Sequence, residues 1–152
     1  MLLHIGRPFS PEVYINEIPA TKANAVLGEQ VTWYGKEYNI TRLWDIPEGM
    51  LLFKPQENVH TSQIIEIRPN KPAIVWFGKR PRDHAWHPIL RDNGFTELHM
   101  KFLQLQNSTG HIEFFKFWSK RLPAKQTFRM KTPEGNRLFL LLLGEGKCVV
   151  YL

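Results

Sequence analysis

The sequence predicts a mainly β fold: a single barrel-like or sandwich domain of about ten short antiparallel strands with one or two short helices. Short runs of β-branched, aromatic and aliphatic residues recur along the chain, and clusters of Gly, Pro, Asn and Asp separate them. Trp, Phe and Tyr make up 12% of the residues, which favours a β-rich core or exposed stacking surfaces. The longest apolar run, Leu138–Leu143, has the length of one buried strand, whose edges a closed barrel would protect.

Strands are predicted in the first half of the chain wherever runs of β-forming residues lie between turn residues. They are Leu2–Ile5, Glu12–Asn16, Gln30–Tyr34, Glu37–Trp44, Met50–Lys54, a strand within Val59–Arg68 centred on Ile64–Ile67, and Ala73–Phe77. Gly35-Lys36 is predicted to join the third and fourth of these strands as a hairpin. Thr21–Leu27 is instead predicted as two turns of helix, with Thr21 as N-cap and Gly28 as the stop.

The character of the chain changes at the polar, basic and aromatic stretch Lys79–His87, which has no usable period and predicts a loop. Pro88–Asn93 is predicted as a short helix, because Pro88 suits a first helical position and Asn93-Gly94 supplies a left-handed stop. The remaining residues, 96–152, predict a C-terminal β-meander in which successive strands lie side by side. Its strands are Thr96–Leu105, His111–Ser119, Gln126–Lys131, Arg137–Leu143 and Lys147–Leu152.

The length of 152 residues suits one domain, residues 1–152, with a sizeable core. The lone Cys148 excludes an intramolecular disulfide and a thiolate zinc cluster, and its apolar surroundings predict a buried, inert thiol. Residues 1–5 are too short for a signal peptide, and no apolar run approaches the length of a membrane span. We therefore predict a soluble, cytoplasmic protein that does not contact membranes.

The net charge of +6 is carried by the second half of the chain. Residues 1–75, the acidic-neutral half, hold 7 Lys/Arg and 8 Asp/Glu, whereas residues 76–152, the basic half, hold 13 Lys/Arg and 6 Asp/Glu. Such asymmetry points to an anionic partner, either a nucleic acid of unknown type or an acidic protein. Solubility alone is the competing explanation, because many small basic domains bind nothing anionic.

The first hairpin of the predicted meander has a register that burial helps to choose. If Asn107–Gly110 is a four-residue loop, Phe102 lies opposite Phe115 and Lys101 lies opposite Lys116. The same register sets Met100 against Phe117, which completes an apolar face. The other face then carries Lys101, Lys116, His99, Trp118 and Lys120, and cations interleaved with an aromatic ring suit a single strand of nucleic acid.

The sequence therefore predicts a nucleic-acid-binding β-domain, DNA-binding or RNA-binding, whose surface combines this hairpin face with the basic loop. Phosphates are predicted to contact cationic side chains, and bases or sugars are predicted to stack on indole rings. The predicted binding residues are Lys79, Arg80, Arg82, Trp86, Lys101, Lys116, Trp118 and Lys120.

Two alternatives stay open. A small metal-independent nuclease would use His84, His87 and His99 as acid and base, with a cation stabilising the phosphorane. A β-rich protein-interaction module would set its basic surface around a dry apolar centre.

A binding protein is favoured over an enzyme, because no phosphate loop, dinucleotide fingerprint or serine-hydrolase elbow occurs. His84-x-x-His87 lacks a third ligand at a recognised spacing, so neither a metal nor a cofactor is predicted.

Overall fold

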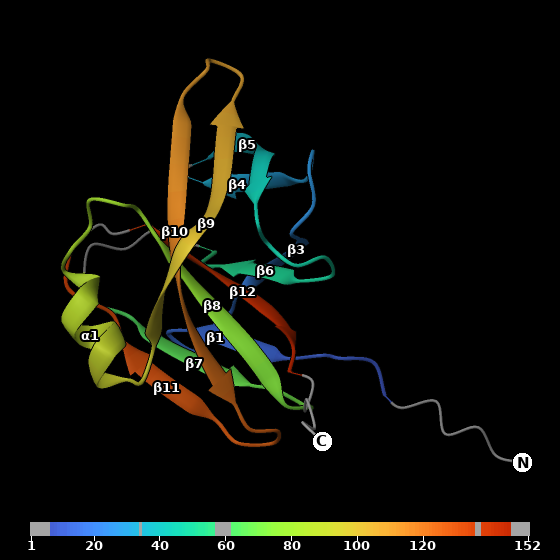
Figure 1. Cartoon of the computed structure of the whole chain (residues 1–152), viewed down its shortest axis with the longest axis vertical. Helices are drawn as coiled ribbons and strands as arrows, with labels where there is room; N and C mark the ends of the chain where they lie inside the picture. The colour runs from blue at the N-terminus through green and yellow to red at the C-terminus, as the bar shows by residue number, and fades with distance from the viewer. Residues whose placement is uncertain (1–6, 34, 57–61, 136–137, 147–152) are drawn as a thin grey trace, which may run out of the picture.

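The structure, a computed structural model of the chain, describes residues 7–33, 35–56, 62–135 and 138–146. It is mainly β, with two sheets and one short helix. The larger sheet curls into a nearly closed barrel, and the smaller sheet and the helix pack beside its lower half in the view of Figure 1. The predicted fold class is confirmed.

Eight strands form the larger sheet, in the order β3-β6-β12-β8-β10-β9-β5-β4. Their bounds are β3 (Thr21–Asn24), β4 (Gln30–Trp33), β5 (Lys36–Trp44), β6 (Leu51–Lys54), β8 (Ala73–Lys79), β9 (Thr96–Asn107), β10 (Ile112–Leu122) and β12 (Phe139–Glu145). Each neighbouring pair is antiparallel. The hairpin of the two longest strands, β9 and β10, extends beyond the helix and the smaller sheet (Figure 1).

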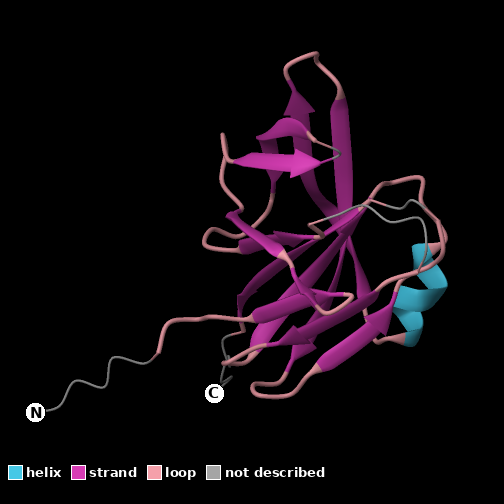
Figure 2. Ribbon diagram, turned by 180° about the vertical axis from the view of Figure 1, so that it is seen from behind, coloured by secondary structure: helices cyan, strands magenta, loops and turns pink. Residues whose placement is uncertain are grey.

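The smaller sheet has four strands in the order β11-β7-β1-β2 and covers part of the outer surface of the larger one. Its strands are β1 (Glu12–Ile15), β2 (Ile18–Pro19), β7 (Ile64–Arg68) and β11 (Phe128–Lys131). Ile65 and Ile67 of β7 pack against Phe77 and Trp118 in one hydrophobic core. Figure 2 shows the helix and the small sheet gathered at the same end of the molecule.

A second hydrophobic core fills the barrel interior, where Trp33 stacks on Phe115 with ring centroids 5.3 Å apart. β12 contributes to both cores, because Leu140 points into the barrel while Phe139 and Leu141 point to the small sheet. A strand buried on both faces gains apolar contacts at every position, which explains the continuous apolar run in its sequence.

The helix α1 (Trp86–Asp92) buries Trp86 and Leu90, which lie four residues apart and therefore share a face. The Trp86 ring lies 4.5 Å from that of Phe77. The helix begins two residues before the predicted start, so Pro88 is its third residue rather than its first; proline is tolerated within the first turn. With 7 residues in α1, no described helix is long enough to cross a bilayer.

The predicted helix over Thr21–Leu27 is wrong, because Thr21–Asn24 forms strand β3 and pairs with β6. Two turns of isolated helix are marginal in water, whereas the strand gains a ladder with β6 and a hydrogen bond from the Thr21 hydroxyl to the Lys54 carbonyl. The predicted strands Leu2–Ile5 and Lys147–Leu152 lie outside the described residues.

The predicted meander is correct for its first hairpin only. β9 and β10 pair directly, but β11 joins the smaller sheet beside β7, and β12 inserts between β6 and β8. The alternation of apolar residues places each strand in a sheet but does not choose its neighbours, because burial is satisfied by any sheet with an apolar face.

The packing of β8 against its neighbours predicts a strict requirement for glycine at position 78. A Cβ added to Gly78 would lie 2.8 Å from Phe117 Cε1 and 2.9 Å from Leu140 Cδ1, and both side chains are fully buried. Gly78→Ala should therefore lower the free energy of unfolding by about 1–3 kcal/mol in urea titrations.

The matched control is Gly144→Ala on β12, where the nearest atom to an added Cβ is a Met50 side-chain carbon at 3.5 Å. That substitution should change stability by no more than about 0.5 kcal/mol. Equal effects of the two alanines would contradict the close packing at Gly78.

Candidate nucleic-acid interface

Beyond the small sheet, β5, β9 and β10 present a surface that we call the outer face, made of Trp44, Phe102, Lys116, Arg42, Gln104 and Phe114. Trp44, Phe102 and Lys116 lie directly opposite one another across the three strands, and Arg42, Gln104 and Phe114 form the next row. Residues opposite each other in antiparallel strands share a face. Leu103 and Phe115 alternate with them into the barrel, so this side of the strands is the one that points outward.

Aromatic rings and a cation pack together on the outer face. The Phe102 and Phe114 rings lie 5.2 Å apart, and the Lys116 ammonium lies 5.9 Å from the Phe102 centroid. Both phenylalanines are half-buried, whereas Trp44 is 54% exposed. An exposed indole of this kind can stack on a ligand ring without any rearrangement of the core, because its flat apolar face is already in contact with water.

The register of this hairpin differs from the predicted one by a single residue. Phe102 lies opposite Lys116, and Leu103 lies opposite Phe115, so Phe102 faces outward rather than into the core. The Asn107 carboxamide oxygen accepts hydrogen bonds from the Thr109 and His111 backbone amides, and this turn uses one residue more than the predicted loop. A shift of one residue exchanges the two faces of a strand.

A bulge completes the rearrangement. The pairing shifts between Lys116 and Trp118, and Met100 has a φ of 61° in the facing segment of β9. Lys101 therefore does not face Lys116, and its ammonium instead forms an ion pair with Asp45. Part of the cationic charge predicted for the hairpin is neutralised in this way.

The lysine that faces Lys116 is Lys79 at the end of β8. Lys79 is 2% exposed, and its ammonium donates a hydrogen bond to the Arg80 carbonyl. Burial lowers the pKa of Lys79, the carboxylates of Asp83 and Glu97 oppose this effect, and Lys116 adds to it. The Lys79 side chain is therefore not at the surface, where the predicted phosphate contact would need it.

The two indoles predicted to stack on bases are also buried. Trp86 is fully buried on α1, and Trp118 is 5% exposed beneath the His87 ring, at a centroid distance of 5.3 Å. Neither ring can stack on a base without unfolding the core around it. The Lys79–His87 stretch has no hydrophobic period that would predict the burial of Trp86.

The candidate stacking residues on the outer face are instead Trp44, Phe102 and Phe114, which the sequence interpretation missed. One signal for them was present: Phe114 and Phe115 are adjacent, and neighbouring residues of a strand point to opposite faces. One of the two rings therefore had to face outward.

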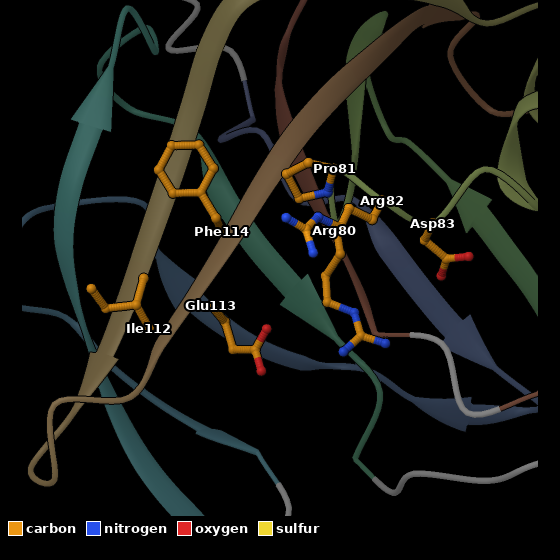
Figure 3. Close-up of a pocket in the computed structure, with 7 residues that line it drawn as sticks. All are labelled: Arg80, Pro81, Arg82, Asp83, Ile112, Glu113 and Phe114. Carbon is orange, nitrogen blue, oxygen red and sulfur yellow. The ribbon is translucent and has the colours of Figure 1, made fainter.

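The basic loop and the hairpin are neighbours, which the sequence could not establish. Arg80, Pro81, Arg82 and Asp83 line a hollow of about 570 Å³ together with Ile112, Glu113 and Phe114 of β10 (Figure 3). β8 ends opposite Lys116, so the first residues of β10, after the hairpin turn, have this hollow rather than a strand at their side. Arg82 is exposed, and Arg80 is half-buried.

Lys120 lies apart from this surface, four residues along β10 from Lys116. At about 3.4 Å per residue of an antiparallel strand, the two Cα atoms are about 14 Å apart. The Lys120 ammonium lies 5.4 Å from the ring centroid of Phe128 on β11. The structure thus places Arg80 and Arg82 next to the part of β10 that carries Phe114, whereas Lys101 is paired with Asp45 and Lys120 lies apart.

The histidines predicted for a nuclease lie in two places. The His84 and His87 rings are 5.0 Å apart, and His87 Nε2 is buried without a hydrogen-bond partner. Burial lowers the pKa of His87, and electrostatic interactions with Lys79, His84 and Arg91 lower it further against the opposing effect of Glu97. His99 is exposed on β9, and among the described residues no group of three His, Cys, Asp or Glu side chains is arranged to hold a metal.

Comparison with known proteins found no match: no family model, no curated protein and no solved structure is similar to this chain. The assignment of a function therefore depends on the geometry of the outer face and of the basic loop.

The environment of His87 predicts a pH-dependent stability. Because the folded state lowers the pKa of this ring below about 6.5, the unfolded chain binds its proton first, and the free energy of unfolding falls as the pH drops through and below that value. His87→Phe removes the buried nitrogen and keeps a ring against Trp118. This variant should flatten the pH dependence between about pH 5 and pH 7.

The control is His99→Gln, which alters an exposed histidine. Chemical denaturation across this pH range should give the parental slope for His99→Gln and a smaller slope for His87→Phe. A parental slope in both variants would contradict the role of His87.

Proposed function

We propose that this protein binds single-stranded nucleic acid on the outer face, with bases stacked on exposed rings and phosphates held by the surrounding cations. The observation that carries the proposal is the joint position of Trp44, Phe102 and Phe114 on one surface next to Lys116 and Arg42. Stacking platforms of aromatic side chains beside a cationic track are typical of proteins that bind single strands.

The basic loop supports the same proposal. Arg80 and Arg82 lie across the hollow from Phe114, so a strand that leaves the outer face past Phe114 meets two guanidinium groups. Guanidinium groups bind phosphate with two parallel hydrogen bonds, and their charge persists at any physiological pH. Single strands are favoured over duplexes, because bases paired inside a duplex cannot reach a flat aromatic surface.

A second candidate is a surface for an acidic protein. Met100 is 63% exposed and Ile112 is 47% exposed, so apolar side chains border the cations. Protein interfaces combine a dry apolar centre with a polar rim.

Fluorescence anisotropy with labelled single-stranded RNA, single-stranded DNA and duplex DNA separates the two candidate functions. A surface for an acidic protein has no reason to prefer unpaired over paired strands.

Removing the exposed indole should weaken binding of single strands. Trp44→Ala should cost about 1–3 kcal/mol of binding free energy, the usual contribution of one stacked base. Leu27→Ala is the matched control, because Leu27 is 66% exposed in the loop between β3 and β4 and is not one of the residues of the outer face. Anisotropy titrations measure both variants, and an unchanged affinity of Trp44→Ala would count against stacking on this ring.

Removing one cation should change the salt dependence of binding. Lys116→Gln and Arg82→Gln should each reduce the log–log slope of affinity against salt by about 0.7, the value for one contact with a single-strand phosphate. Titrations between about 50 mM and 200 mM salt measure this slope.

Lys131→Gln on β11 is the control, since Lys131 is also exposed but belongs to the smaller sheet. It should keep the parental slope. If all three variants lower the slope equally, the charge acts as a general field and the outer face is not the contact surface.

A further inference from the structure

The hollow beside β10 has two kinds of polar group on its walls. The loop contributes the guanidinium groups of Arg80 and Arg82 and the carboxylate of the buried Asp83, and β10 contributes the carboxylate of Glu113. Figure 3 shows Glu113 on the wall facing the arginines, with Phe114 on the adjoining part of the strand. A ligand that is anionic at one end and donates hydrogen bonds at the other fits these walls, whereas a plain polyanion would be repelled by the carboxylate.

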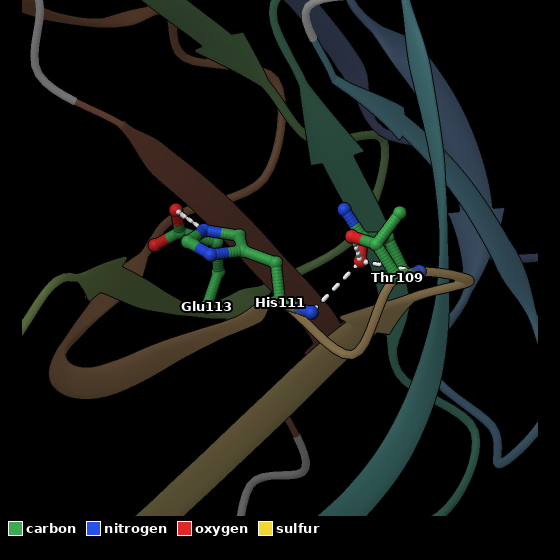
Figure 4. A network of polar contacts seen from close by, with 4 residues as sticks. Thr109, His111 and Glu113 are labelled. Carbon is green, nitrogen blue, oxygen red and sulfur yellow. Dashed lines mark hydrogen bonds and ion pairs between the residues drawn. The ribbon is translucent and has the colours of Figure 1, made fainter.

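The position of Glu113 is fixed by its neighbours. His111 Nε2 lies 2.9 Å from Glu113 Oε1, and the His111 backbone amide donates to the Asn107 side chain in the hairpin turn (Figure 4). The Thr109 amide and hydroxyl also donate to that side chain. The turn therefore holds His111, and His111 holds one carboxylate oxygen, which leaves Oε2 to accept from a ligand.

The volume of the hollow, about 570 Å³, is within the usual range for a site that encloses a small molecule or one unit of a polymer. Two of its lining residues, Ile112 and Phe114, are on the outer side of β10, whereas Glu113 reaches it from the opposite side of the strand, so the hollow adjoins the outer face at the edge of β10. A strand bound on the outer face can place one nucleotide in it, with the phosphate near the arginines and the base edge near Glu113.

We infer that this hollow selects a base that carries an exocyclic amino group, as guanine, adenine and cytosine do, and disfavours uracil and thymine. A carboxylate accepts a hydrogen bond from an amino group, as in the pairing of Glu with the cytosine amino group. Uracil and thymine carry carbonyl oxygens in place of these amino groups, so their one donor on this edge, the ring N3–H, lies between two oxygens that repel the carboxylate. This inference rests on the proposed binding of single strands and adds a base preference at one place on the surface.

The test compares oligocytidine with oligouridine of equal length on the full chain at neutral pH. The two probes have the same backbone and similar rings, and differ chiefly in the group that meets Glu113. Oligocytidine should bind about tenfold more tightly, the size of one good base contact. In Glu113→Gln the ratio should fall close to one, because an amide can turn either its oxygen or its nitrogen to the base.

Two further variants separate base selection from charge and from misfolding. Arg80→Gln should weaken both probes by the same factor and keep their ratio. Glu12→Gln removes an exposed carboxylate from β1 and should change neither affinity. Circular dichroism confirms that each variant keeps the β fold.

The outcomes distinguish this inference from the proposed function. Binding of both probes with equal affinity by the parent chain overturns the inference and leaves strand binding intact. A cytidine preference that survives Glu113→Gln also overturns it. Failure of every probe to bind, at low as well as high salt, overturns the proposed function and the base preference with it.

Discussion

The packing of the small sheet and α1 against only part of the barrel is the constraint on which the rest of the molecule depends. Phe77 is at the centre of that contact, with its ring 4.5 Å from that of Trp86 and 5.5 Å from that of Phe139. Burial of these large rings contributes most of the stabilisation expected where the layers meet. Because the small sheet and α1 cover only part of the larger sheet, the outward-facing side chains of the uncovered part remain at the surface.

Strand β10 shows the transition along one face. Trp118 and Leu122 lie in the core between the two sheets, whereas Lys116 and Phe114, on the same side of the strand, lie on the outer face. At the boundary, Lys79 is buried opposite Lys116, and its ammonium is compensated by the Arg80 carbonyl and the nearby Asp83 and Glu97 carboxylates. The buried lysine thereby fixes the start of the loop that carries Arg80 and Arg82.

Much of the fold could be predicted from the sequence, because strand positions follow from local alternation and turn residues. The hairpin of β4 and β5 and the strands β6 to β10 lie close to their predicted ranges. Neighbour relations beyond the first hairpin could not be predicted, since β11 and β12 satisfy their apolar faces against strands that are distant in sequence. Thr21–Asn24 became a strand because β6 offered it a partner.

The candidate site was harder to predict than the fold. One additional residue in the Asn107 turn exchanged the faces of Phe102 and Leu103, and a sequence alone does not fix how many residues a loop uses. Trp86 and Trp118 were assigned to the surface because their burial depends on long-range contacts with Phe77 and His87. The proximity of Arg82 to Phe114 is likewise a tertiary fact.

The central claim is that the outer face, with the adjoining basic loop, is the contact surface for single strands. Backbone amide NMR spectra recorded while unlabelled single-stranded RNA is added test it most directly, because every strand reports separately. The account predicts shifts at Trp44, Phe102, Phe114 and Lys116 and in the loop around Arg82, with β1, β7 and β11 unchanged. Shifts confined to the small sheet, or none at low salt, would contradict it.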